Sequence, residues 1–252
     1  MNVNRVKDCK LFLTLTLIIL SNDTAAQLVT DRPDQTESSS TVPTGSLQIE
    51  SGIYLEYEDE EHPESQRLLL PTTLFRYGIN KRVELRLLNQ YEQRKIANDR
   101  FSGISDLEIG TKIQLLKSVE NPTEIAFLSH LIIPSGSQAI SDQRLGTVSK
   151  LCLSHQLNEM LALGYNVGYN YFGSGRGDLT YSLSLGIRVN EHAGLYVEPY
   201  GEWANMEDGV LNCDAGFTYL ATNNLQFDFS FGTGISRMMN YLSFGCSWLI
   251  VM

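Results

Sequence analysis

The sequence predicts an all-β protein, a closed antiparallel transmembrane β-barrel of about twelve strands. Apolar and polar residues alternate from Gly45 almost to the C-terminus, as in strands that have one apolar face. Long polar connections and short turns built on Asn follow one another along the chain, which is typical of outer-membrane barrels. The face opposite the apolar one carries charged, amide and small residues, which suit a water-filled lumen.

The amino end predicts a cleaved secretory signal peptide over residues 1–26. Three basic residues precede an apolar run over 11–20, and small residues follow at 24–26. The alternative, a membrane-anchor helix, needs about 20 apolar residues, roughly twice the length of this run. Together with the predicted barrel, this favours export to the outer membrane of a Gram-negative cell.

Residues 27–44 form a polar segment that is too polar for lipid and too short to be a domain. We expect it to enter the lumen from the periplasm as a plug or latch; the alternative is a solvated periplasmic tail. Its candidate residues are Asp31, Arg32 and Asp34, and we expect Arg32 to pair with a lumen carboxylate such as Glu50.

The barrel is predicted over residues 45–252, and the clearest alternation runs from Leu161 to Tyr171. Runs of about ten residues can cross the hydrocarbon when tilted, whereas ordinary strands average about five or six. The predicted strands are 47–58, 67–78, 83–92, 106–115, 124–133, 147–157, 161–171, 179–189, 194–203, 210–220, 225–232 and 240–251.

A soluble β-sandwich is the main alternative, because its strands also alternate. Aromatic residues near the run ends favour the bilayer, where they form interfacial girdles. The girdle candidates are Tyr57, Tyr77, Tyr91, Tyr171, Tyr181, Trp203, Tyr219, Tyr241 and Trp248. The chain ends on Met252 rather than on the aromatic residue usual for such barrels, which is a departure from the pattern.

The charge of the chain makes nucleic acid an unlikely partner. Its 19 Lys and Arg against 29 Asp and Glu give a formal net charge of −10, which opposes binding to phosphates. An acidic tip over 58–61, followed by His62, is expected to face the outside as a solvated loop; the alternative is that it shares divalent cations with lipopolysaccharide.

Cysteine and histidine give no sign of a cofactor or metal. Cys9 lies in the signal peptide, and Cys152, Cys213 and Cys246 have no metal or disulfide spacing, so we expect small buried side chains. Within each of the pairs Ser129-His130 and Ser154-His155, the two side chains point to opposite faces of the strand. Neither pair can therefore act as a nucleophile and its base by itself. A cross-strand pair such as Ser154 with His130 is the remaining enzyme hypothesis, and the sequence predicts no enzyme.

The polar faces of the predicted strands carry charged residues of both signs. Buried charges need partners, so we expect most of them to pair across strands and brace the wall, while some select solutes. The acidic excess favours cations weakly. These inward-facing candidates are Glu50, Arg76, Glu84, Arg86, Asp106, Glu108, Lys112, Arg188, Glu198, Glu202 and Asp228.

Several motifs resemble a known family, the outer-membrane barrels assigned to the phenol-degradation MetA pathway. They are Thr-Asp-Arg-Pro-Asp-Gln-Thr-Glu-Ser at 30–38, Val-Pro-Thr-Gly at 42–45, Gln-Ile-Glu at 48–50, Leu-Phe-Arg-Tyr-Gly-Ile at 74–79, Val-Glu-Leu-Arg at 83–86, Gly-Ile-Ser-Asp-Leu at 103–107 and Gly-Thr-Lys at 110–112. The resemblance implies a barrel that moves hydrophobic or aromatic solutes, and it transfers no functional residue.

We therefore expect a pore or facilitator for small solutes, hydrophobic or aromatic ones among them. The alternative is a non-transporting barrel that stiffens the envelope or binds lipopolysaccharide. The expected partners are outer-membrane lipid, lipopolysaccharide, the barrel-assembly machinery and the solutes themselves; neither a catalytic residue nor a cofactor is expected.

Overall fold

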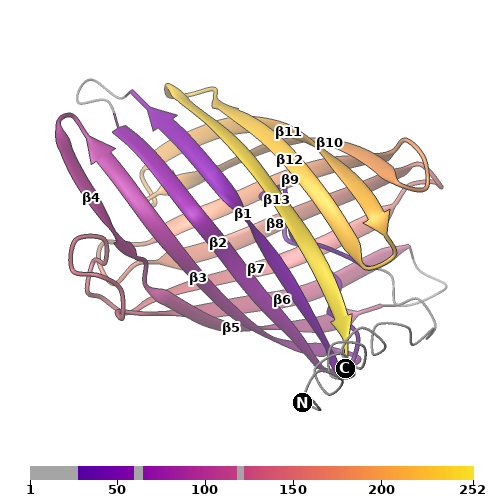
Figure 1. Ribbon diagram of the computed structural model, residues 1–252. Helices are drawn as coiled ribbons and strands as arrows, with labels where there is room; N and C mark the ends of the chain where they lie inside the picture. Colours follow the sequence, from indigo (N-terminus) through magenta and orange to yellow (C-terminus); the bar gives the residue numbers. More distant parts are fainter. Residues whose placement is uncertain (1–27, 60–64, 118–121) are drawn as a thin grey trace, which may run out of the picture.

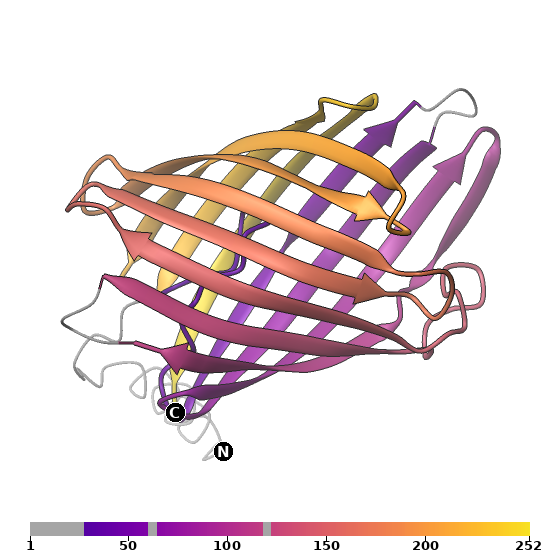
Figure 2. The same cartoon turned by 180° about the vertical axis from the view of Figure 1, so that it is seen from behind.

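The computed structural model describes residues 28–59, 65–117 and 122–252, which form an antiparallel barrel (Figures 1 and 2). The predicted signal peptide and the tip residues Glu60, Glu61 and His62 lie outside the described residues. The strands are β1 (Ser46–Glu58), β2 (Ser65–Asn80), β3 (Val83–Ile96), β4 (Asp99–Ile104), β5 (Leu107–Leu116), β6 (Thr123–Ile133), β7 (Gly146–Gln156), β8 (Leu161–Tyr171), β9 (Asp178–Arg188), β10 (Ala193–Ala204), β11 (Asp208–Thr222), β12 (Leu225–Gly234) and β13 (Met239–Val251).

The thirteen described strands occupy twelve positions in a closed ring. β1 pairs with both β13 and β2, and the β2–β3 pairing completes the circle. β4 and β5 share one position in the ring. β4 pairs with the C-terminal half of β3, and β5 pairs with its N-terminal half. The prediction of about twelve strands is confirmed. The sequence prediction missed β4, because the alternation restarts only after the break at Ser105 and Asp106.

The two ends of the barrel differ. The first described residue, Leu28, and the C-terminus lie at the end that also carries the short connections β2–β3 and β11–β12, which we call the terminal end (Figure 1). The opposite end, the loop end, carries the long connection 134–145. The longest described connection therefore lies away from the termini, as the asymmetry of the sequence predicted.

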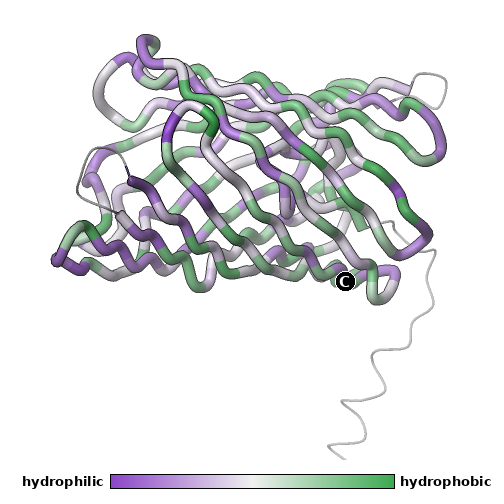
Figure 3. The backbone as a smooth tube through the Cα atoms, turned by 90° about the horizontal axis from the view of Figure 1, so that it is seen from above, coloured by the Kyte–Doolittle hydropathy of each residue, from purple (hydrophilic) through white to green (hydrophobic). Residues whose placement is uncertain are grey.

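The outward face of the wall is apolar. Alternate side chains such as Val167, Leu183 and Phe231 are 43–52% exposed, and green and purple positions alternate along the strands (Figure 3). A soluble protein rarely exposes a continuous apolar surface of this extent, whereas a bilayer covers it. Closure leaves no sheet edge to face lipid. No helix in the described ranges is long and apolar enough to span a membrane.

One predicted girdle residue faces the other way. Tyr241 is 2% exposed and its hydroxyl donates to Asp214, so it belongs to the lumen and the girdle prediction is wrong there. Tyr57, Trp203 and Trp248 are about half exposed near strand ends, where an interfacial aromatic would lie.

The inward face is polar, and the residues before β1 lie against it. Among the described residues, buried apolar side chains form two small clusters, one of which contains Ala126, Leu128 and Cys152. The polar residues before β1 run through the interior of the barrel (Figure 2). The interior is thus held together by hydrogen bonds and ion pairs rather than by an apolar core, and this arrangement creates the candidate site.

Candidate functional site

Residues 28–43, which we call the lumen segment, enter and leave at the terminal end. Leu28 and Val42, near the two ends of the segment, pack with Leu249 of β13 in one buried apolar cluster. Thr44 then forms a parallel bridge to Gly78, and the chain continues into β1. The segment is therefore a loop whose two ends are held together at the terminal end and whose middle reaches into the lumen.

Asp31 is the centre of the contacts on the β2–β5 side of the wall. Its carboxylate accepts from Arg86 Nη1 at 2.5 Å and from Lys112 Nζ at 2.8 Å. A third cation, Arg76, has Nη1 3.2 Å from Asp31 Oδ2. Since Arg76, Arg86 and Lys112 are each at most 2% exposed, these ion pairs are shielded from water and are among the strong charge-assisted contacts.

Three more carboxylates complete this group. Glu50 and Glu84 each lie within 3.0 Å of an arginine, and Glu37 accepts from Arg86 Nη2 at 2.9 Å. We call the whole set the anchor cluster; its members are Asp31, Glu37, Glu50, Arg76, Glu84, Arg86 and Lys112. Four carboxylates against three cations leave it nearly neutral, which is the condition under which buried charges are tolerated.

The backbone of the lumen segment also binds to the anchor cluster. Arg76 donates to the carbonyl oxygens of Val29 and Ser40, and the amide of Val42 donates to Glu84. Burial favours the neutral form of Asp31, but the charges of Arg76, Lys112 and Arg86 outweigh it and hold the pKa of this carboxyl well below its usual value. Asp31 is therefore ionised at neutral pH and holds the segment electrostatically.

Arg32 points to the opposite side of the segment from Asp31. Its guanidinium lies 3.0 Å from Asp228 of β12 and 2.9 Å from the Ser243 hydroxyl of β13. Arg32 thus pairs with a lumen carboxylate as predicted, but the partner is Asp228 rather than the suggested Glu50, which accepts the amide of Asp31. Neighbouring residues of an extended chain point in opposite directions, so Arg32 cannot reach the carboxylate that lies under Asp31.

Two glycines make room for Arg32. Gly52 and Gly245 are direct partners on β1 and β13. A Cβ atom on either would clash with the Arg32 guanidinium, which approaches the backbone closely there. The wall is thus shaped to accept this side chain.

The middle of the segment contacts the far wall, β8 to β10. The Gln35 amide donates to Glu198 at 2.6 Å, the Thr36 hydroxyl also donates to Glu198, and the Glu37 amide donates to Asn166 at 2.7 Å. Burial and the neighbouring charge of Glu198 raise the pKa of the Asp34 carboxyl well above its usual value. The segment therefore spans the lumen from the anchor cluster to β10.

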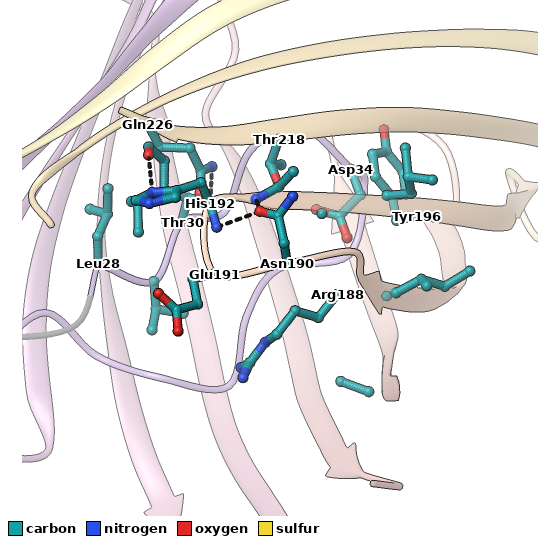
Figure 4. Close-up of a pocket in the computed structure, with 18 of the residues that line it drawn as sticks. Leu28, Thr30, Asp34, Arg188, Asn190, Glu191, His192, Tyr196, Thr218 and Gln226 are labelled. Atoms are coloured by element: carbon teal, nitrogen blue, oxygen red, sulfur yellow. Dashed lines mark hydrogen bonds between the residues drawn. The ribbon is translucent and has the colours of Figure 1, made fainter. Parts of the chain in front are cut away.

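Two cavities lie on either side of this middle part. The terminal cavity, about 670 Å³, opens at the terminal end between the segment and β8–β12. Figure 4 shows Asp34 and Tyr196 at one side of it, away from Leu28. The loop cavity, about 270 Å³, lies towards the loop end and is lined by Gln35, Tyr54 and Tyr200 among others. Both volumes are of the order of small-molecule sites.

The other predicted lumen charges lie elsewhere. Asp106 falls in the break between β4 and β5, where it accepts from the Gly136 amide and the Ser141 hydroxyl and so fastens the long connection. Glu108 lies 2.9 Å from His130. Arg188 lines the terminal cavity and Glu202 the loop cavity.

The cross-strand pair of the enzyme hypothesis, Ser154 with His130, is not formed. Ser154 is bonded to Ser39 at 2.6 Å, whereas His130 is bonded to Arg86 and Glu108. In the β6–β7 register Ser154 lies opposite Glu124, so the structure does not bring Ser154 and His130 together. Among the residues that the structure describes, no group of three or more His, Cys, Asp or Glu could hold a metal ion.

Several residues of the site were not found from the sequence. Gln35, Thr36 and Glu37 lie next to the predicted residues, but nothing in the pattern distinguishes those that touch the wall. Asp214 could have been found, because it alternates with the outward Cys213 and Ala215 in a predicted strand.

The chain matches the family described as "Putative MetA-pathway of phenol degradation" over residues 30–239. The chain belongs to this family. The match covers most of the lumen segment and most of the barrel.

Solved structures share the fold at low identity. The COG4313 outer membrane channel from Pseudomonas putida F1 is similar with a TM-score of 0.75 and 12% identity, over 86% of this chain and 100% of that one. The KdgM porin in complex with disordered oligogalacturonate has a TM-score of 0.53 and 10% identity, over 78% and 98%. The NanC porin has a TM-score of 0.50 and 9% identity, over 79% and 98%. No curated protein matches the chain.

Proposed function

We propose that this family member is a passive outer-membrane channel for small solutes, and that the lumen segment is its plug. The fold is that of outer-membrane barrels, and the family description points to the use of aromatic compounds. The observation that carries the proposal is the pair of cavities, one towards each end of the barrel, with the hydrogen-bonded lumen segment between them. A solute can enter a cavity from either end, and it must pass the lumen segment to reach the other cavity.

The lining of the cavities supports small solutes with an aromatic or apolar part. Tyr196 and Leu28 line the terminal cavity, and Tyr54 and Tyr200 line the loop cavity. Tyrosine offers an apolar ring together with a hydroxyl, so a phenol-like solute would find both stacking surfaces and hydrogen-bond partners. Hydrophobic or aromatic solutes of this size are therefore the proposed cargo.

We place the terminal end in the periplasm and the loop end outside. A barrel with both termini at one end and long loops at the other is inserted in this way. The residues next to the signal peptide then enter the lumen from the periplasm. Assembly by the barrel-assembly machinery and contact of the loop end with lipopolysaccharide belong to the same proposal.

The test replaces residues 28–43 by a Gly-Ser linker of equal length, so that β1 and the signal peptide are unchanged. In planar bilayers, the native chain should open rarely and the replaced chain should conduct steadily. Liposomes that contain the replaced chain should also swell faster in small aromatic solutes. If both proteins are silent in both assays although they show heat-dependent gel migration, the chain is the alternative, a non-transporting structural or lipopolysaccharide-binding barrel.

A further inference from the structure

The two cavities are separated by a barrier one residue layer thick. Along β10 the inward side chains are Tyr196, Glu198 and Tyr200; the first lines the terminal cavity and the last the loop cavity. Along β9, Ser184 lines the terminal cavity and Ser182 the loop cavity. Only the level of Glu198, with the part of the lumen segment bonded to it, stands between the two cavities along this wall.

The barrier contains three carboxyl groups, which we call the acidic layer: Asp34, Glu198 and Asp214. Glu198 and Asp214 are direct partners on β10 and β11, and they are 0% and 2% exposed. Asp34 of the lumen segment lies against the same wall, where burial and the charge of Glu198 raise the pKa of its carboxyl. Like charges directly opposite each other in a sheet are destabilising, so something must compensate this arrangement.

Compensation by a protein cation is incomplete there, because Lys150 of β7, which lines the loop cavity, acts on Glu198 only through its charge. Within the described ranges, no Lys or Arg forms an ion pair with Glu198 or Asp214, whereas the anchor cluster across the lumen holds three cations. Glu198 accepts from the lumen segment and shares a hydrogen bond with the Asp214 carboxyl group, and one Asp214 oxygen accepts from Tyr241. The neutral donors Gln35, Thr36 and Tyr241 therefore do not cancel the charge.

Unpartnered oxygens point to what completes the layer. Asp214 Oδ1 and Asn212 Oδ1 belong to successive inward side chains of β11 and are buried. Apart from the contact between the Glu198 and Asp214 carboxyl groups, neither atom has a hydrogen-bond donor, and Asn212 also lines the loop cavity. Both atoms are acceptors, so the missing partner is a cation or a donor. A buried acceptor without a donor is costly in free energy, and a bound cation would remove this cost.

We propose that the acidic layer is the charge-selective constriction of the channel, which passes cations and neutral solutes and rejects anions. This inference rests on the proposed function. No metal-holding group exists among the described residues, so the layer is suited to transient contact with monovalent cations or organic ammonium groups. Rings of carboxylates select cations in other channels by the same electrostatics.

The first test measures reversal potentials in planar bilayers under a KCl gradient. The full chain should prefer potassium over chloride severalfold, and the double variant Glu198→Gln with Asp214→Asn should lose most of that preference. Glu202→Gln, whose side chain lines the loop cavity outside the layer, is the matched control and should keep it. An unchanged preference in the double variant, or an equal loss in the control, overturns the inference.

The second test does not depend on conduction. Crystals of the native chain in rubidium bromide should show anomalous density for rubidium beside Asp214, and none for bromide, with the rubidium lost in the double variant. Rubidium density in the layer without ion conduction in bilayers would contradict the proposed function, but it would support the cation preference of the layer. An empty layer, in which Glu198 and Asp214 share only a proton, or bromide in its place, overturns the inference whatever the bilayers show.

Discussion

The substitution Asp31→Asn tests most directly whether ion pairs hold the lumen segment in the barrel. The Asp31 carboxylate lies 2.5, 2.8 and 3.2 Å from nitrogens of Arg86, Lys112 and Arg76. The substitution removes the charge but keeps the shape, and an amide oxygen can still accept the Ser38 amide that Asp31 accepts at 2.8 Å. The change therefore tests the ion pairs rather than the packing.

The expected cost follows from the burial of these pairs. Removal of one partner of a buried ion pair costs about 3 to 5 kcal/mol. Glu37, Glu50 and Glu84 remain beside the three cations after the substitution, which balances the charges and points to the lower end, about 3 kcal/mol. At about 1.4 kcal/mol per factor of ten, the ratio of docked to released segment should fall by roughly a hundredfold.

The measurement is the fraction of time that single channels are open, recorded for the native chain and the variant at neutral pH. Asp208→Asn, an exposed carboxylate at the start of β11, is the control for the loss of one negative charge. Heat-dependent gel migration should show that all three barrels are folded. If Asp31→Asn opens no more often than Asp208→Asn, while replacement of residues 28–43 does open the channel, the anchor cluster does not hold the plug.

Three further predictions concern other parts of the molecule. The pKa of Asp34 is raised in the docked state, so docking should strengthen as the pH falls from above that raised value towards the ordinary carboxyl range. The channels should therefore open less often in acid. Asp34→Asn should flatten this pH profile. Gly245→Ala places a Cβ against the Arg32 guanidinium and should raise the open fraction in the same recordings, whereas Gly186→Ala, where a Cβ meets only one atom at 3.7 Å, should not. Val167→Arg, on the outward face of β8, should lower the free energy of unfolding in lipid by about 2 to 4 kcal/mol, whereas Val167→Leu should leave it nearly unchanged; an equal effect in detergent-free buffer would contradict the membrane assignment.

Much of the fold could be predicted because the period of alternation and the turn residues are local properties of the chain. The runs 161–171 and 225–232 each fall within a strand of the structure. β4 was missed because Ser105 and Asp106 interrupt the alternation, and continuity across such a break is decided by pairing with β3 rather than by the residues themselves. Tyr241 was assigned to the girdle from its position near a strand end, although its place in the alternation of β13 turns it inward.

The partners within the lumen could not be predicted in the same way. The residue types of Asp31, Arg32 and Asp34 suggested contacts with wall charges, but the choice of partner depends on the direction in which each side chain leaves the segment. Arg32 meets Asp228, which is 196 residues away in the sequence, and no pattern in one sequence relates the two. The acidic layer likewise arises only when β10 and β11 are in register.

The two sides of the lumen segment are held by contacts of unequal strength, and this determines how the plug would move. On the β2–β5 side, Asp31 and Glu37 join buried ion pairs whose disruption costs about 3 to 5 kcal/mol each. On the β9–β10 side, hydrogen bonds from Gln35 and Thr36 to Glu198 hold the segment; neutral bonds contribute about 0.5 to 1.5 kcal/mol and those to a charged group about 1.5 to 3. The repulsion between Asp34 and Glu198 opposes even these. The segment should therefore leave the β9–β10 wall first and pivot about the anchor cluster, which joins the terminal and loop cavities into one path along that wall without complete release of the plug.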